Sequence, residues 1–299
     1  MSEAEATPSL QFYQISDTPR LPDTGANAVH FWASTDNKKL LEDSGEKSLL
    51  VTDWFGNSPL HYAAACSSYV CAEHIVNNFP NNHFFNMDKL TPAHIAAQKG
   101  DVHMLQIFQK SKFLLNEVTN CNWTILHFAV IYGHLETVRF ILENCDNSML
   151  YVLTDGVETI LNTNQIKDLK FYSVLDIAKA MKNDEMVNLL LQFHALPSLH
   201  SAIMSQNYRA FSYFLFSPHK ANLNYAAEYR NCTALHIAAA YDYYEICHSL
   251  LMCGASADLL DVDGYSPLDI AIIHNATNSG QLILPNCSPE RVSAAYCIA

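Results

Sequence analysis

Apolar residues recur along this chain in short blocks whose spacing predicts helices. One kind of block is a compact, alanine-rich run, such as Tyr62-Ala63-Ala64 or Ile237-Ala238-Ala239. The other kind, as in the stretch from Cys71 to Val76, has apolar residues at positions i, i+1, i+4 and i+5, which lie on one face of a helix. The two kinds alternate, and this pattern predicts a series of helix pairs that each bury one face.

A four-residue motif precedes each alanine-rich block and recurs with a period of about 33 residues. Ser58-Pro59-Leu60-His61, Thr91-Pro92-Ala93-His94 and Thr124-Ile125-Leu126-His127 follow one another at this period, as do Thr233-Ala234-Leu235-His236 and Ser266-Pro267-Leu268-Asp269. Ser or Thr supplies a helix N-cap, and Pro at the first helical position loses no hydrogen bond. The period, the motif and the glycines at turn positions together resemble the ankyrin repeat.

The resemblance implies an all-α ankyrin-repeat solenoid, in which helix-turn-helix repeats are connected by β-hairpin fingers. It covers residues 27–274, with a degenerate N-terminal cap at 27–52 and seven repeats that start near residues 53, 86, 119, 168, 195, 228 and 261. The fifth repeat lacks most of its leading hairpin. A cap is expected because each repeat buries its apolar face only against a neighbour.

Three segments depart from the repeat. Residues 1–26 contain three prolines and few apolar residues, so we expect an extended or disordered segment. The extra residues between 144 and 172 include Asp155-Gly156 between β-prone tetrads, which predicts an inserted β-hairpin near 150–160, either a bare finger or a binding element. The tail, residues 275–299, is predicted to be loop up to Asn286 and then a short capping helix at 289–297.

The composition excludes several classes of partner. The 299 residues include 17 Lys and Arg and 30 Asp and Glu, which gives a formal charge of −13. No run of basic residues is longer than Lys38-Lys39. We therefore do not expect the chain to bind nucleic acid or an anionic membrane. No apolar stretch is long enough for membrane insertion, and the acidic N-terminus is unlike a leader. Nine cysteines without a Cys-x-x-Cys pair indicate reduced thiols. We therefore expect an intracellular, cytoplasmic protein, with nuclear or cytoskeletal association as alternatives.

Fourteen histidines invite a catalytic or metal-binding role, but their positions favour a structural one. Those at positions 61, 94, 127, 200 and 236 end the four-residue motif, where the ankyrin resemblance implies bonds to the local backbone and to the adjacent turn. Asp176 and Asp269 replace them in two repeats. No nucleophile elbow, phosphate-binding loop or zinc motif occurs, so no catalytic residue, no metal and no cofactor is predicted. A small-molecule-binding protein or enzyme at the irregular junction of the fourth and fifth repeats is the alternative from a different class.

The resemblance places partner contacts at the hairpin tips and at the end of each first helix. Aromatic residues and Arg are frequent there, and these residue types anchor protein interfaces. The chain is therefore expected to be a non-enzymatic adaptor, scaffold or assembly subunit that binds one or more proteins, alone or within a larger assembly. The predicted partner-binding residues are Trp54, Phe55, Met87, Asp88, Trp123, Tyr132, Tyr172, Tyr229, Arg230, Tyr241 and Tyr265.

One short motif suggests a second, regulatory role. Asp43-Ser44-Gly45-Glu46-Lys47-Ser48 has the Asp-Ser-Gly-x-x-Ser pattern of the phosphodegron in I-kappa-B inhibitors, where two phosphoserines recruit a ubiquitin ligase. The resemblance implies that Ser44 and Ser48 are phosphorylation sites and that the chain is an inhibitor removed by ubiquitination. Because the motif lies within the predicted cap, it differs from the degron of those inhibitors, which is on a free tail.

Overall fold

The computed structural model describes residues 24–79, 83–113, 115–155, 171–216, 222–227 and 230–297. Within these ranges the regular elements are all helices, arranged as consecutive pairs, so the predicted all-α repeat architecture is confirmed. The chain forms two compact units. Residues 1–149, 154–170 and 177–189 make up the first unit, and residues 150–153, 171–176 and 190–299 make up the second. Most of the predicted N-terminal segment (1–23) and residues 156–160 of the predicted inserted hairpin lie outside the described residues.

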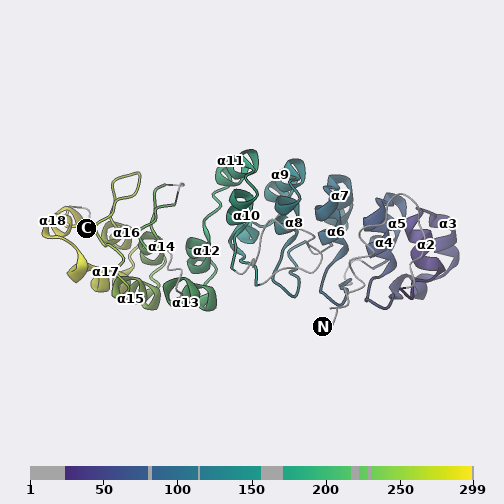
Figure 1. Cartoon of the computed structure of the whole chain (residues 1–299), viewed down its shortest axis with the longest axis horizontal. Helices are drawn as coiled ribbons and strands as arrows, with labels where there is room; N and C mark the ends of the chain where they lie inside the picture. Colours follow the sequence, from purple (N-terminus) through teal and green to yellow (C-terminus); the bar gives the residue numbers. More distant parts are fainter. Residues whose placement is uncertain are drawn as a thin grey trace, which may run out of the picture. The chain divides into compact units, whose positions relative to one another are not determined.

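The first unit begins with a helical cap, which is followed along the chain by three regular helix pairs (Figure 1). Pro or a β-branched residue begins each first helix, and the apolar stripe of each second helix is buried as its spacing predicts. The pairs are α4 (Pro59–Cys66) with α5 (Tyr69–Asn78), α6 (Pro92–Lys99) with α7 (Val102–Lys110), and α8 (Ile125–Ile131) with α9 (Leu135–Asn144). The cap consists of α2 (Ala28–Ser34), α3 (Lys38–Asp43) and the 3₁₀ helix η1 (Glu46–Leu50).

The second unit also consists of helix pairs, packed around one apolar core. The pairs are α12 (Ser198–Met204) with α13 (Tyr208–Phe216), α14 (Ala234–Ala240) with α15 (Tyr244–Met252), and α16 (Pro267–Ile273) with α17 (Thr277–Ile283), followed by η3 (Leu284–Asn286) and α18 (Pro289–Ala295). The remaining elements, η2 (Asn147–Tyr151), α10 (Val174–Ala180) and α11 (Asp184–Gln192), cross the division between the units.

The prediction of a loop from residue 275 to Asn286 is wrong, because the second helix of the last repeat, α17, lies there. Its first turn contains Asn, Ser and Gly, which are poor helix formers. Asp242, on the preceding repeat, compensates by accepting hydrogen bonds from the backbone N–H of Ser279 at 2.8 Å and from Asn278 Nδ2 at 2.8 Å. Burial of Ser279 and Ile283 completes the helix, so tertiary contacts override weak local propensity.

Four of the motif histidines, His61, His94, His200 and His236, join their repeat to the next finger. Nδ1 of His61 accepts a hydrogen bond from the backbone N–H of Ser58 at 3.0 Å, which leaves Nε2 to donate to the carbonyl of Leu90, 3.0 Å away in the following finger. Burial lowers the pKa of His61 to about 4, so the ring is neutral in the fold. The same bond to the next finger is made by His30 to Asn57, His94 to Trp123, His200 to Cys232 and His236 to Tyr265.

Aspartate stands in the motif where no finger follows. Asp269 accepts hydrogen bonds from the backbone N–H and the hydroxyl of Ser266, both at 2.8 Å, and thus caps α16. It belongs to the last repeat, after which the described residues contain no further finger. Asp176 caps α10 in the same way through Ser173, and the repeat after it begins at Pro197 without a leading hairpin. A carboxylate suffices there because only the local cap is needed.

Candidate protein-binding surface

A side chain at the start of each finger builds its turn. Asp53 Oδ1 accepts from the backbone N–H groups of Phe55 (2.9 Å) and Asn57 (2.8 Å). Asn86, at the equivalent position of the next repeat, accepts from two backbone N–H groups in the same way, and so does Asp261 in the second unit. These side chains satisfy the inner backbone groups of the turn, so the residue after each of them is turned outward.

One backbone hydrogen bond joins each finger to its neighbour. In the first unit the N–H of Met87 donates to the carbonyl of Phe55 at 2.9 Å, and the N–H of Asn120 donates to the carbonyl of Asp88 at 3.1 Å. In the second unit the N–H of Val262 donates to the carbonyl of Arg230 at 2.9 Å. Since these bonds use only backbone atoms, the tip side chains are not needed for the connection.

The finger tips present large apolar side chains to solvent. Trp54 is 63% exposed and Met87 is 69% exposed, although both are large and apolar. The backbone N–H of Trp54 donates to the carbonyl of Thr24 at 2.8 Å, and its ring passes so close to Gly25 that a β-carbon there would clash. Val262 is 67% exposed at the same turn position and was not predicted, although the repeat register aligns it with Trp54 and Met87.

Two predicted tyrosines lie exposed at the turn after a first helix. Tyr132 caps α8, and its hydroxyl lies 2.9 Å from Gln98 Nε2 of the preceding repeat. Tyr241 caps α14 and stacks on Tyr243, with 5.5 Å between the ring centroids. Contacts to neighbouring residues therefore fix the direction of both rings while leaving part of each ring accessible.

Trp123 was predicted to bind a partner, but it is a core residue. Its exposure is 0%, and its ring lies 5.7 Å from the rings of His127 and Phe128. The position aligns with the buried Leu90 of the preceding repeat, and not with the tips. A finger residue four places after the turn-building side chain points into the stack, so aromatic character alone misled the prediction.

The other predicted residues are distributed between surface and interior. Phe55, Asp88, Tyr172 and Tyr265 are half-buried. Arg230 is exposed and forms an ion pair with Asp263 on the next finger. Tyr229 lies outside the described residues.

Ser44 and Ser48 lie in a folded part of the cap. Ser44 is the C-cap residue of α3 and its hydroxyl donates to the Leu41 carbonyl at 2.6 Å, while the two serine hydroxyls are 2.5 Å apart. A phosphate would replace these bonds with negative charge at a helix C-terminus, which the helix dipole disfavours. The motif is thus held in α3 and η1, unlike the free peptide on which a phosphodegron is read, and the inhibitor interpretation is not favoured.

Metal ligands and ionised thiols are two kinds of group that catalytic sites use. They contain no group of three or more His, Cys, Asp or Glu side chains arranged to hold a metal ion. Burial raises the pKa of Cys71 to about 12 and that of Cys247 to about 11, which keeps these thiols protonated at neutral pH. No helix in the described part of the chain is long and apolar enough to cross a bilayer.

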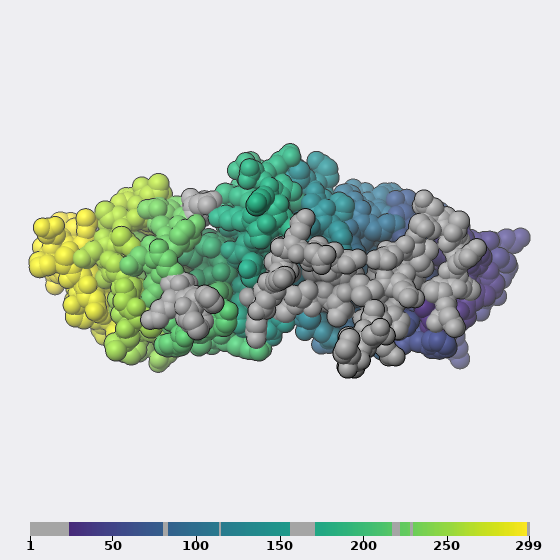
Figure 2. All heavy atoms as spheres, in the orientation of Figure 1, coloured from purple at the N-terminus to yellow at the C-terminus, as the bar shows by residue number. Residues whose placement is uncertain are grey.

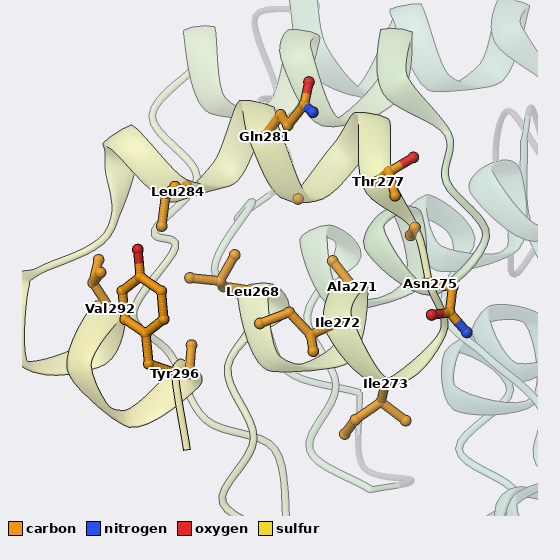
Figure 3. A pocket seen from close by; sticks show the side chains of 13 residues that line it. Leu268, Ala271, Ile272, Ile273, Asn275, Thr277, Gln281, Leu284, Val292 and Tyr296 are labelled. Carbon is orange, nitrogen blue, oxygen red and sulfur yellow. The ribbon is translucent and has the colours of Figure 1, made fainter. Parts of the chain in front are cut away.

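A pocket of about 620 Å³ lies in the second unit between α16, α17 and α18 (Figure 3). Leu268 and Ile272 line it from α16, and Tyr296 and Leu284 approach from the opposite side. Its lining contains no Asp, Glu, Lys, Arg, His or Cys side chain. The pocket therefore has apolar surface with amide and hydroxyl groups but no charged acid or base.

Parts of this chain are similar in sequence to parts of longer known proteins. A putative E3 ubiquitin-protein ligase, XBAT31 of Arabidopsis thaliana, is 30% identical over 155 residues, which are 50% of this chain and 33% of that protein. The human NAD-capped RNA hydrolase NUDT12 is 41% identical over 63 residues, 20% of this chain and 14% of that protein. The chain thus spans a third or less of the length of these relatives.

Solved structures and a family model were also compared. The ankyrin repeat domain of Bcl-3, described as a unique member of the IkappaB protein family, aligns with 85% of this chain and 99% of that chain, at 20% identity and a TM-score of 0.44. A family model described as ankyrin repeats (3 copies) matches residues 68–151 and 199–292. Since these two segments make up more than half of the sequence, the chain belongs to the ankyrin-repeat family.

Proposed function

We propose that this chain is a non-enzymatic, cytoplasmic adaptor, scaffold or assembly subunit that holds a protein partner against the finger tips of its first unit. The observation that carries the proposal is the pair of solvent-exposed apolar tips, Trp54 and Met87, at the same turn position of two fingers joined by a backbone bond. Repeats of this family serve as protein-interaction scaffolds, and their tips are where partner specificity resides. The named activities of the long relatives are not extended to this chain, which matches only a fraction of each.

The chemistry of the tips favours a partner with an apolar contact segment. Trp54, Met87 and the helix-end Tyr132 supply large contact areas, and aromatic residues and Met are enriched at the buried centres of interfaces. Lys89 and Lys99 are exposed charged residues on the same fingers and helix ends, where a polar rim is expected. Exposure of large apolar side chains is unfavourable in water, and contact with a partner would remove this exposed area from water.

The test is capture of partners from native lysate by the intact chain, beside a variant with Trp54→Ser, Met87→Ser and Tyr132→Ser. Bound proteins are quantified by mass spectrometry. We expect the variant to capture at least about tenfold less of a stoichiometric partner than the unaltered chain, because each of the three side chains contributes on the order of 1–2 kcal/mol to binding. Trp123 is excluded from the variant because its loss would destabilise the stack.

A matched control carries Leu40→Ser and Val70→Ser, which remove exposed apolar side chains from α3 and α5, away from the tips. This control should retain the partner. Equal loss in both variants, or unchanged binding by the tip variant with an unchanged thermal melt, would contradict the proposal.

A further inference from the structure

The last helix of the second unit, α18, has the features of the first helix of a further repeat. Ser288 is its N-cap and Pro289 its first residue, as Ser266 and Pro267 are in α16. α18 contacts α16, just as α16 contacts α14. Each of the first helices α12, α14 and α16 is followed by a second helix, whereas no helix follows α18 within the described residues, which reach residue 297. The second-helix position beside α18 is therefore filled by no element of the described chain.

The pocket between α16, α17 and α18 lies at this second-helix position. In the preceding repeat, the second helix α17 contacts the second helix α15, its own first helix α16 and the preceding first helix α14. One repeat further on, a second helix would contact α17, α18 and α16. These three helices form the walls of the pocket of about 620 Å³ (Figure 3), at the C-terminal end of the second unit, which is yellow in Figure 2. The pocket thus has the walls that a second helix requires.

The residues that line the pocket from α17 correspond to residues of α15 that are less exposed. Cys247 on α15 is fully buried beside Ser279 of α17. Gly280, one repeat period after Cys247, lines the pocket and is only half-buried. Leu251 on α15 is half-buried, whereas Leu284, one period later, also lines the pocket and is 40% exposed. The same face of the second helices is thus covered in one repeat and open in the next.

Asn275, in the wall of the pocket, has the position of a helix cap. Asp242, one repeat period earlier, accepts a hydrogen bond from the backbone N–H of Ser279, the third residue of α17. In the first unit, Asp36 accepts at 2.8 Å from the backbone N–H of Cys71, the third residue of α5. Asp36, Asp242 and Asn275 all have a positive φ, between 53° and 56°. No hydrogen bond joins the side-chain amide of Asn275 to another described residue, so its Oδ1 is available to accept from the third N–H of a further helix.

We infer that this pocket, defined by Asn275, Gly280, Leu284 and Tyr296, binds one amphipathic helix of a protein partner. The helix packs an apolar stripe, at positions i, i+1, i+4 and i+5, against α17 and α18, and the N–H of its third residue donates to Asn275 Oδ1. Charge agrees with a stripe of this kind, because no charged side chain lines the pocket. The interface continues the stacking of α15 against α17 by one further helix, on a surface separate from the finger tips.

Other occupants match the pocket less well. The second helices α5, α7, α9 and α15 already bury their apolar stripes within their own unit, so a second copy of this chain would have to unfold a repeat to supply one. A small apolar molecule would fill the apolar part of the pocket but would not need the acceptor at Asn275. A helix of a different protein matches both the apolar walls and the cap.

The test measures the binding of a helical probe to the full chain by fluorescence anisotropy. The probe is a labelled synthetic peptide with the sequence of α9, Leu135–Asn144, cross-linked between the exposed positions 139 and 143 because so short a helix is not stable alone. We expect saturable binding of this peptide. The same peptide with Val138→Ser and Ile141→Ser, which lacks the apolar stripe, should not bind.

Substitutions in the pocket locate the binding site of the probe. At Gly280 a β-carbon would lie at an ordinary 3.7 Å from that of Ala271, but the longer side chain of Gly280→Leu occupies the pocket and should weaken binding at least about tenfold. Asn275→Gly keeps the positive φ and removes the acceptor, which should weaken binding about fivefold. Asn275→Asp should retain binding, because Asp242 caps α17 in this way. Ala294→Leu, at an exposed position of α18 outside the pocket lining, should leave binding unchanged.

Thermal melts of each variant establish that it is folded. Absence of saturable probe binding, equal binding of the two peptides, or binding that Gly280→Leu does not weaken overturns the inference. Equal affinities of the Asn275→Gly and Asn275→Asp variants for the probe contradict the assigned cap. Uptake of an apolar dye that Gly280→Leu blocks, in a chain that does not bind the probe, would assign the pocket to a small molecule and not to a helix.

Discussion

The two units have the same interior plan but different surfaces. In both, histidines bridge repeats, turn-building side chains shape the fingers, and small residues fill the space between first helices. Among the described residues, however, the second unit exposes twelve large apolar side chains and the first unit exposes six. This difference indicates that stacking constrains only the residues in contact between repeats, whereas solvent-exposed positions can vary and acquire binding roles.

The largest difference in stability between the two units is expected at acidic pH. Burial lowers the pKa of His61, His94 and His200 to about 4, so between pH 6.5 and 4 the unfolded chain binds protons that the folded chain does not. The contribution of each ring to the free energy of unfolding is therefore complete above pH 6.5. As the pH falls from 6.5 to 4, about 3 kcal/mol of this free energy is lost for each ring. Two of the three rings, His61 and His94, are in the first unit, which should be the more acid-sensitive.

Two signals can follow the units during urea unfolding. All three tryptophans, Trp32, Trp54 and Trp123, lie in the first unit, so their fluorescence reports that unit, whereas circular dichroism reports all helices. From about pH 7.5 to about pH 5 the fluorescence midpoint should fall further than the dichroism midpoint. His274→Gln, which removes an exposed ring, should keep the same acid response. Midpoints that do not move over this range would refute the prediction.

Trp123→Ala should cost about 3–5 kcal/mol, because it leaves a cavity beside two packed rings. The change tests whether the first unit depends on that side chain as core. Its free energy of unfolding is measured by circular dichroism, with the exposed Trp54→Ala as the matched tryptophan control. Similar losses from the two substitutions would show that Trp123 is no more important to packing than a surface residue.

Turn-building carboxylates should differ in importance between the units. Asp53 accepts from two backbone N–H groups, from Asn57 Nδ2 at 3.1 Å and from the Tyr62 hydroxyl at 3.0 Å, whereas the bonds of Asp261 are to two backbone N–H groups. We expect Asp53→Ala to cost about 3 kcal/mol and Asp261→Ala about 1.5 kcal/mol. Urea denaturation of both variants checks the order, and a larger loss at Asp261 would contradict it.

The smallest effects on stability should come from the finger tips. Trp54→Ser loses its contact with Gly25 and should cost about 1 kcal/mol or less, and Val262→Ser in the second unit should stay within about 0.5 kcal/mol. Thermal melts of the two variants measure this. A fall comparable with that of Trp123→Ala would mean that the tips support the stack and are not free for a partner.

Most of the fold could be predicted from the sequence because stacking imposes a strict period. The constant spacing of the four-residue motif identifies the first helices and their caps, and the paired stripes identify the second helices. The helix α17 was missed because its own residues favour a turn and its cap, Asp242, is distant in the sequence. A hydrogen bond that forms only when two repeats pack together cannot be predicted from the local sequence of either repeat.

The candidate surface could be predicted only in part. Trp54, Met87 and Tyr241 are exposed as expected. The prediction for Trp123 was wrong because it rested on residue type. The position of Trp123 in the repeat is that of the buried Leu90, which indicates an interior side chain. The exposure of Phe216 and Met252, at the ends of α13 and α15, was not predicted, because apolar residues at the end of a helix resemble core residues in the sequence.

The backbone bonds between fingers also bear on how this chain can change over time. The N–H of Met87 and the carbonyl of Phe55 hold the spacing of two tips, and neither atom depends on the side chain beside it. Mutation at a tip can therefore exchange one side chain for another while its position and direction stay fixed. A lineage carrying this chain could acquire a new partner by single substitutions, without first rebuilding the scaffold that presents them.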